Sequence, residues 1–320
     1  MQKKLAVTSS PHLRASVTTR SVMADVCIAL IPAGLASVWF FGLRALILIL
    51  TCVASCVLVE YAYQKITHQK VTAGDMSAVV TGLLLAYNLP ANAPAWMAVI
   101  GSVIAIILVK QIFGGIGQNI FNPALMARAI LFISWGTIMA SYPQATPGEW
   151  MVGMAGGAAD AISSATPLSA VGSDTYSVMN LFLGNVPGVL GETSKVALLL
   201  GGLYLLVRRV IDWRIPVTFI ATVFVCYLLK DGANVALYQI LSGGLFIGAF
   251  FMATDYATSP ITPWGKIIMG VGCGLLLFVI RAFANYPEGC SFAILFMNMA
   301  TPLIDKYTMP RSFGEVKQHG

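Results

Sequence analysis

Charged residues are scarce in this chain. Only 10% of its 320 residues are Asp, Glu, Lys or Arg, whereas 58% are hydrophobic and the mean hydropathy is +0.80. Soluble globular domains carry about 25% charged residues, so the composition excludes this class and indicates a polytopic protein surrounded by the lipid bilayer. A net charge of +6 could suggest nucleic acid as a partner of a soluble chain. Here we expect no nucleic-acid partner. The positions of the Lys and Arg residues instead indicate how the chain is oriented in the membrane.

The sequence also lacks the spacing motifs of metal and redox centres. It has no CxxC motif, and His12, His68 and His319 stand apart in polar segments. Of the six cysteines, Cys52 and Cys56 are four residues apart and therefore share one face of a helix. Such a pair can bind a metal or form a redox couple, or it can simply pack as two small side chains between helices. We favour the packing contact. We predict no metal site within the chain.

Long apolar runs, by contrast, fill most of the sequence. A helix that spans a bilayer needs ~20 predominantly apolar residues, and ten stretches approach this length. They are residues 22–41, 43–63, 76–89, 93–112, 123–142, 194–211, 215–229, 235–254, 266–284 and 289–304. The pattern predicts an all-α polytopic membrane protein with about ten transmembrane segments. The first run is long enough to stay in the bilayer, so we expect no cleavable signal peptide.

The distribution of Lys and Arg predicts how these segments are oriented. With a cytoplasmic N-terminus, all but four of the 19 fall on the cytoplasmic side, as the positive-inside rule requires. The four exceptions are Arg44, Lys195, Lys230 and Arg281. The predicted division is a cytoplasmic arm (1–21), a first membrane half (22–142), an external loop (143–193), a second membrane half (194–304) and a cytoplasmic tail (305–320). The external loop contains no Lys or Arg, and loops of such length are usually functional or disordered.

The two membrane halves resemble each other in sequence. In the first half, 12 residues separate Gly82 from Pro94, and the same spacing separates Gly248 from Pro260 in the second. Each pair brackets an interrupted apolar segment, and the two segments cross in opposite directions. We therefore predict an inverted repeat of five plus five segments, against the alternative of chance similarity. Interrupted helices in matching positions indicate a site near the midplane.

A glycine-rich stretch precedes the fifth segment. It reads Phe113-Gly-Gly-Ile-Gly-Gln-Asn-Ile-Phe-Asn-Pro-Ala124, and it brings backbone N–H groups together with the side-chain amides of Asn119 and Asn122. Such a place suits a polar ring or a phosphate at a helix start. Taken alone, the stretch is more typical of a tight loop between helices than of a binding site, and the bare pattern favours the loop.

Acidic residues inside or beside a membrane are candidates for function. Asp25 lies within the first segment and Asp255 directly follows the interrupted eighth segment. We take these two as the candidates for ion coupling.

Two other acids have structural interpretations. Asp75 stands at the start of the third segment, where it can cap the helix near Ser77. Glu60 is expected to pair with Lys65 or Lys70 near the cytoplasmic surface.

Several stretches together resemble the D subunit of the Rnf electron-transport complex and its relative, the B subunit of the sodium-translocating NADH:quinone oxidoreductase. They are Ser9-Ser-Pro-His12, Gly74-Asp-Met-Ser-Ala-Val-Val-Thr-Gly-Leu-Leu-Leu-Ala86, the Phe113–Ala124 stretch and Asp160-Ala-Ile-Ser-Ser-Ala-Thr-Pro-Leu168. The resemblance covers essentially the whole chain. The length of the chain and its short N-terminal arm suit the Rnf subunit better than the quinone oxidoreductase subunit.

The resemblance implies a flavoprotein. In this family FMN is attached through its phosphate to a threonine hydroxyl by a flavin transferase, which acts on a Ser/Thr-Gly-Ala-Thr/Ser signal. The matching residues are Ser163, Ser164, Ala165 and Thr166, with Asp160 leading the motif and Thr166 as the acceptor. Ser164 replaces the usual glycine. A small residue preserves access, although a positive φ would be less favourable there.

The resemblance further implies a second, non-covalent flavin (riboflavin) within the helices. We take the interrupted segment around Asn88 and the Phe113–Asn122 loop, with Asn119 and Asn122, as candidate positions. The implied partners are the other Rnf subunits, including a flavinylated external subunit and cytoplasmic nicotinamide and iron–sulfur subunits, together with the flavin transferase. The implied location is the bacterial inner membrane.

The leading hypothesis is therefore a subunit that carries electrons through flavins, coupled to Na⁺ or H⁺ movement within a translocating oxidoreductase. No nicotinamide or iron–sulfur motif is present, so we assign no catalytic residue and expect no activity from the chain alone. The alternative is a solute channel or transporter of inverted-repeat fold without a cofactor. The inverted repeat by itself supports both.

Overall fold

The computed structural model describes residues 17–148, 167–168, 176–284 and 288–310. These residues are helical apart from turns, extended connections and one isolated β-bridge between Pro90 and Val189. The all-α prediction is therefore confirmed. The helices are α1 (Thr19–Ile66), α2 (Ser77–Tyr87), α3 (Ala95–Val103), α4 (Pro123–Ser134), α5 (Gly136–Met139), α6 (Val178–Leu183), α7 (Lys195–Val207), α8 (Arg214–Asp231), α9 (Ala233–Leu241), α10 (Leu245–Ile247), α11 (Pro263–Phe283) and α12 (Cys290–Thr308), with the short 3₁₀ turn η1 (Ala73–Asp75) and the π-helices η2 (Ile104–Gln111) and η3 (Gly248–Met252).

Helix α1 contains two of the predicted segments. Its 48 residues would extend about 72 Å as a straight helix, more than twice the ~30 Å of the hydrocarbon core. The backbone leaves helical geometry at Gly42, where φ is 67° and ψ is −156°. Glycine tolerates a positive φ, so the helix breaks where the first predicted segment ends.

Few helices are individually long enough to cross a bilayer. Among the described residues, α1 and α11 have the length and composition of a span. A third span is obtained if α9 and α10–η3 are taken together as one broken span, bent by 67° at a short break. The remaining apolar helices are shorter or interrupted. Each of the ten predicted segments contains helix. That all ten span the membrane, and that they form an inverted repeat, stay predictions.

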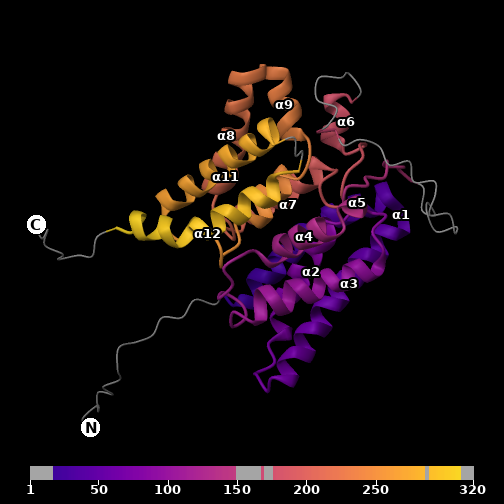
Figure 1. Cartoon of the computed structure of the whole chain (residues 1–320), viewed down its shortest axis with the longest axis vertical. Coiled ribbons are helices and arrows are strands. Elements are labelled where there is room, and N and C mark those ends of the chain that lie inside the picture. The colour runs from indigo at the N-terminus through magenta and orange to yellow at the C-terminus, as the bar shows by residue number, and fades with distance from the viewer. Residues whose placement is uncertain (1–16, 149–166, 169–175, 285–287, 311–320) are drawn as a thin grey trace, which may run out of the picture.

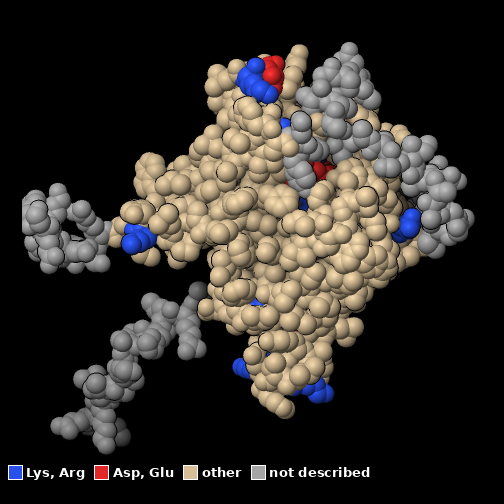
Figure 2. All heavy atoms as spheres, in the orientation of Figure 1, with Lys and Arg blue, Asp and Glu red and all other residues tan. Residues whose placement is uncertain are grey.

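The two halves of the chain form neighbouring groups of helices (Figure 1). Helices α1–α5 lie together, α7–α12 form the other group, and α4 packs against α12 between them. Charged atoms are few on the face shown in Figure 2 and lie mostly at its extremities, so a broad uncharged surface separates them. Such a surface is what a lipid environment requires.

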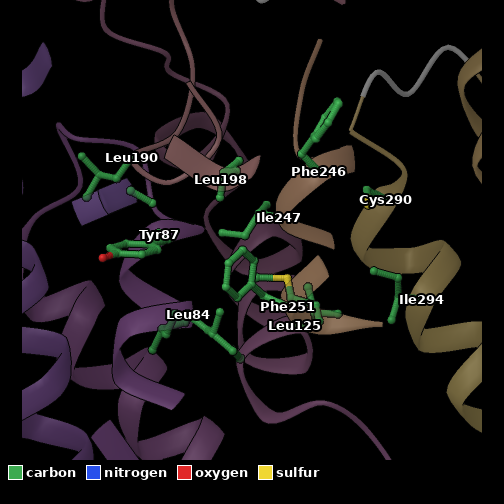
Figure 3. Close-up of a cluster of buried hydrophobic side chains, with 14 of the residues drawn as sticks. Leu84, Tyr87, Leu125, Leu190, Leu198, Phe246, Ile247, Phe251, Cys290 and Ile294 are labelled. Atoms are coloured by element: carbon green, nitrogen blue, oxygen red, sulfur yellow. The ribbon is translucent and has the colours of Figure 1, made fainter. Parts of the chain in front are cut away.

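The core lies between the two groups. Leu84, Leu125, Leu198, Phe251 and Ile294 come from five different elements and meet in the cluster drawn in Figure 3. Cys52 and Cys56 are fully buried in the packed helices, which fits the predicted helix contact. The described residues contain no cluster of potential metal ligands.

The end of the predicted external loop is part of this core. Leu190 and Gly191 donate backbone hydrogen bonds to the carbonyls of Leu89 and Tyr87, at 3.1 and 2.9 Å. A Cβ on Gly191 would lie only 2.2 Å from that of Tyr87, so glycine permits the close approach. Residues 186–194 thus connect the interrupted segment of the first half to the start of α7.

Candidate functional site

The residues of the predicted flavin-attachment signal, Asp160, Ser163, Ser164, Ala165 and Thr166, lie outside the described residues. The structure describes the two residues that follow them. Pro167 and Leu168 are both buried, and Leu168 lies against Gly243. A Cβ on Gly243, whose φ is 67°, would be 2.6 Å from Leu168 Cδ1 and 3.0 Å from Arg281 Nη2. Leu168, two residues after Thr166 in the sequence, therefore lies near Gly243 and Arg281.

A buried ion pair joins the two halves of the protein. The guanidinium of Arg128, in α4, pairs with the carboxylate of Glu288, which closely precedes α12, and both side chains are only 6% exposed. Arg128 also donates to Asn88 Oδ1 at 3.2 Å and to Ser291 Oγ at 3.0 Å. A buried guanidinium needs such partners, because an unpaired charge in a low dielectric is costly.

More charges surround this pair. Glu192 and Lys195 are buried, and the Lys195 ammonium donates to the carbonyls of Glu192 and Gly243. Arg281 donates to the carbonyls of Gln239 and Ser242, at 2.8 and 3.2 Å. We call Arg128, Glu192, Lys195, Arg281 and Glu288 the charge cluster, because each interacts electrostatically with others of the group. Four of the five are buried, and Arg281 is partly buried.

Sequence reasoning missed this cluster. It counted Arg128 among the cations of the cytoplasmic side and assigned it no partner, whereas the structure buries it in an ion pair. The pair was not predicted because the partner lies 160 residues away in sequence. The available signal was that Arg128 stands inside the predicted segment 123–142 rather than at its end.

A second buried ion pair corrects the expectation for Glu60. Its carboxylate lies 2.8 Å from the Lys110 ammonium, and both side chains are nearly inaccessible. Gln111 Nε2 donates to the same carboxylate at 2.7 Å. Neither Lys65 nor Lys70 is its partner, because Glu60 points toward η2 instead of the surface. Asp75 behaves as predicted, accepting the backbone N–H of Ser77 at 2.8 Å.

A pocket of about 560 Å³ lies where the start of α1 meets η2, the glycine-rich loop and the residues after η3. Its polar lining includes Ser77, Thr81, Lys110, Asn119 and Asp255. Ligand sites of about 300–1,000 Å³ are typical of small-molecule pockets. A flavin ring therefore fits the space by volume, and amides, hydroxyls and an ammonium are available for its polar edge.

The predicted residues Asn119 and Asp255 come together in this pocket. The Asn119 side chain and the backbone N–H groups of Tyr256 and Ala257 lie near the Asp255 carboxylate and interact with it electrostatically. The carboxylate accepts a hydrogen bond from Thr258 Oγ1 at 3.3 Å, and Asn119 Nδ2 donates to the Phe121 carbonyl at 3.0 Å. Gly114, Gly115 and Gly117 all have positive φ, which explains the glycines of the loop that positions Asn119.

Asn122 has a structural role. Its side-chain oxygen caps α4 by accepting the N–H groups of Ala124 and Leu125, at 3.1 and 3.3 Å, and its amide donates to the Met252 carbonyl at 3.4 Å. The Asn122-Pro123 pair thus begins a helix in the usual way. It also ties that helix start to η3 in the other half.

Asp25 lies apart from this pocket. Its carboxylate accepts from Tyr204 Oη at 2.9 Å and pairs with Arg208 at 3.2 Å. The same end of the molecule carries Asp212. Burial alone would raise the pKa of Asp212, but hydrogen bonds from the Arg214 backbone and from Lys266 outweigh it and lower this pKa.

These features define a helical membrane protein in which ion pairs and a polar pocket lie between interrupted helices. The chain belongs to the NQR2, RnfD, RnfE family, whose sequence pattern matches residues 6–314. It is 47% identical to the D subunit of the Na⁺-translocating ferredoxin:NAD⁺ oxidoreductase complex of Acetobacterium woodii, over 98% of this chain and 96% of the relative. It is 41% identical, over 96% of both chains, to the D subunit of the proton-translocating complex of Clostridium ljungdahlii. The corresponding protein of Escherichia coli is 37% identical over 97% of this chain and 99% of the relative.

The resemblance seen in the sequence motifs to the D subunit of the Rnf complex is thereby confirmed. These relatives are named as subunits of oxidoreductase complexes that translocate ions. The two more similar relatives differ in the ion that their names give, so identity alone does not distinguish Na⁺ from H⁺.

Proposed function

We propose that this chain is the membrane subunit of an ion-translocating ferredoxin:NAD⁺ oxidoreductase and carries electrons through FMN bound covalently to Thr166. A second, non-covalent flavin lies in the polar pocket, and electron transfer is coupled to Na⁺ or H⁺ movement. The observation that carries the proposal is the family match over residues 6–314, joined to the Ser163–Thr166 signal that matches the family's attachment sequence.

When bound, the flavins supply the redox chemistry, and the chain supplies position and electrostatics. Pro167 and Leu168 are buried directly after the acceptor, so they anchor one end of the attachment segment against the membrane half. Asn119, Ser77 and Thr81 line the pocket proposed for the second flavin. The glycine turns of the Phe113–Ala124 stretch hold Asn119 at that wall.

Asp255 is the better of the two ion-coupling candidates. It lines the pocket and has no cation within ion-pair distance among the described residues. The Asp25 carboxylate is already neutralised by Arg208. A carboxylate that faces a polar pocket beside an amide can exchange a cation or a proton, and it would sense charge on a nearby flavin.

The covalent flavin is tested by expressing the chain with the partner subunits and the flavin transferase. The wild-type band should fluoresce under ultraviolet light on a denaturing gel, and mass spectrometry should find FMN on a peptide from residues 143–193. Thr166→Ala should abolish both signals, and Ser169→Ala is the matched loop-hydroxyl control. A wild-type peptide without flavin would defeat the proposal and favour a cofactor-free channel.

A further inference from the structure

Another pocket, of about 680 Å³, lies between the turn that joins α7 to α8, the residues after η3 and the start of α11. Its lining includes three cations, Arg209, Arg214 and Lys266, and one acid, Asp212. With all four groups ionised, their formal charges sum to +2. A concave surface with an excess of one sign of charge concentrates ligands of the opposite sign. The lining therefore favours an anion.

The acid of this pocket is already neutralised by its neighbours. Asp212 Oδ2 accepts hydrogen bonds from Arg214 Nη1 at 2.7 Å and from Lys266 Nζ at 3.1 Å, so one carboxylate serves two cations. Arg209 forms no ion pair within the described part of the chain. The pocket thus combines a guanidinium that has no carboxylate partner there with an ion triplet of net positive charge. Guanidinium groups bind phosphate through paired N–H groups.

The backbone at Arg209 is unusual for an arginine. Helix α7 ends in a Schellman turn, in which Val210 N–H donates to the Leu205 carbonyl at 2.9 Å and Arg209 N–H donates to the Leu206 carbonyl at 3.0 Å. Arg209 occupies the left-handed position of this turn, with a φ of 55°. Glycine is usual there because a side chain costs energy in that conformation. The turn itself therefore has no need of an arginine, whereas the pocket gains a guanidinium from it.

Exposed apolar residues accompany the cations. Trp213 and Ile261 line the pocket and are 56% and 75% exposed. Val207 and Trp264, each close in sequence to a lining residue, are exposed as well. Tryptophan is enriched at the headgroup level of membrane proteins. A soluble anion would gain nothing from these apolar groups, whereas a lipid combines a charged headgroup with apolar chains.

We propose that this pocket binds the headgroup of an anionic phospholipid from the surrounding bilayer. Arg209, Arg214 and Lys266 contact its phosphate, and Trp213 and Ile261 contact the start of its acyl chains. Basic pockets between membrane helices suit anionic headgroups of this kind. The predicted orientation places the three cations on the cytoplasmic side. The inference goes beyond the proposed function and needs no flavin, so each can fail without the other.

The test is the binding of phosphatidylglycerol to the full chain. The protein is purified in detergent, stripped of lipid and titrated, and bound lipid is measured by native mass spectrometry. It should bind phosphatidylglycerol in preference to phosphatidylcholine, which has no net charge. Arg209→Gln and Lys266→Gln should each weaken binding about fivefold, and the double variant about 30-fold, because each removes one cation from the site. Lys266→Arg keeps the charge and should keep most of the binding.

Lys306→Gln is the matched control. Lys306 is exposed, belongs to the same predicted side of the membrane and does not line the pocket, so its loss should leave binding unchanged. Equal weakening by Lys306→Gln would show attraction by general surface charge and would overturn the inference. Equal affinity for phosphatidylcholine, or unchanged binding in the double variant, would overturn it too. Displacement of the lipid by inorganic phosphate would identify a soluble anion as the ligand instead.

A second measurement locates the lipid in the assembled complex. Phosphatidylglycerol with a photoreactive acyl chain should attach, on irradiation, to peptides that contain Trp213 or Ile261, and much less in the double variant. Attachment in the isolated chain but not in the complex would mean that another subunit covers this face, and would overturn the inference. Without added lipid, Arg209→Gln and the wild type should melt at the same temperature, which separates loss of binding from loss of folding.

Discussion

At the scale of single residues, the most consequential contact is between Arg128 and Glu288. The two side chains are buried, come from different halves of the chain and satisfy each other's charge. Removal of one partner from a buried pair leaves an uncompensated ion, whereas removal of both does not.

We therefore expect Arg128→Met and Glu288→Leu each to destabilise the protein by about 3–5 kcal/mol. The double variant Arg128→Met/Glu288→Leu should recover much of the loss, which is measured as the melting temperature in detergent. Arg208→Gln is the control, because Arg208 is 56% exposed in its pair with Asp25 and exposed pairs contribute at most about 1 kcal/mol. Additive losses in the double variant would contradict this account.

At the scale of elements, small residues set the distance between helices. Gly201 on α7 packs against α1, and a Cβ there would lie 2.0 Å from the carbonyl oxygen of Ala29. Membrane helices approach closely where small residues face each other. The contact matters because α1 belongs to the first half and α7 to the second.

Gly201→Ala should force α1 and α7 apart and cost about 1–3 kcal/mol. Gly136→Ala is the matched control, because a Cβ at Gly136 meets nothing within 4 Å. The two variants can be compared by melting temperature and by yield of folded protein in detergent. Equal behaviour would show that the α1–α7 contact adapts to the added methyl group.

At the scale of the whole molecule, the orientation in the membrane remains a prediction from the Lys and Arg distribution. Lys70 lies beyond the end of α1 and Lys230 near the end of α8, and both are exposed. The predicted orientation places Lys70 in the cytoplasm and Lys230 outside.

Single cysteines at these positions, in a variant without the native cysteines, test this orientation. A membrane-impermeant maleimide should label Lys230→Cys in intact cells and Lys70→Cys only in inside-out vesicles. The reversed pattern would invert the topology and place the attachment loop in the cytoplasm. The predicted topology requires an odd number of membrane crossings between residues 70 and 230. Labelling of both cysteines from the same side would contradict it.

The helices themselves could be read from the sequence. Apolar length, with glycine, proline and asparagine at the breaks, is a local property, and it located the interruptions at Gly42, after Tyr87 and after Met252. The helix start at Asn122-Pro123 is likewise local, because the cap and its partners lie within three residues. Asn119 and Asp255 could also be selected in advance, since polar groups beside an interrupted membrane helix are unusual.

Their proximity could not be inferred in this way. Asp255 and Asn119 meet only because η3 and the glycine-rich loop pack together, and Glu60 turns away from the nearby Lys65 and Lys70 toward Lys110. The choice of partner for a buried charge depends on which helix faces it across the core, and 160 residues separate Arg128 from Glu288. The sequence by itself determined where the helices lie and which residue types stand at their breaks, because those features follow from local geometry and lipid solubility. Only the tertiary structure decided which charges neutralise each other, because electrostatic pairing depends on distance in space.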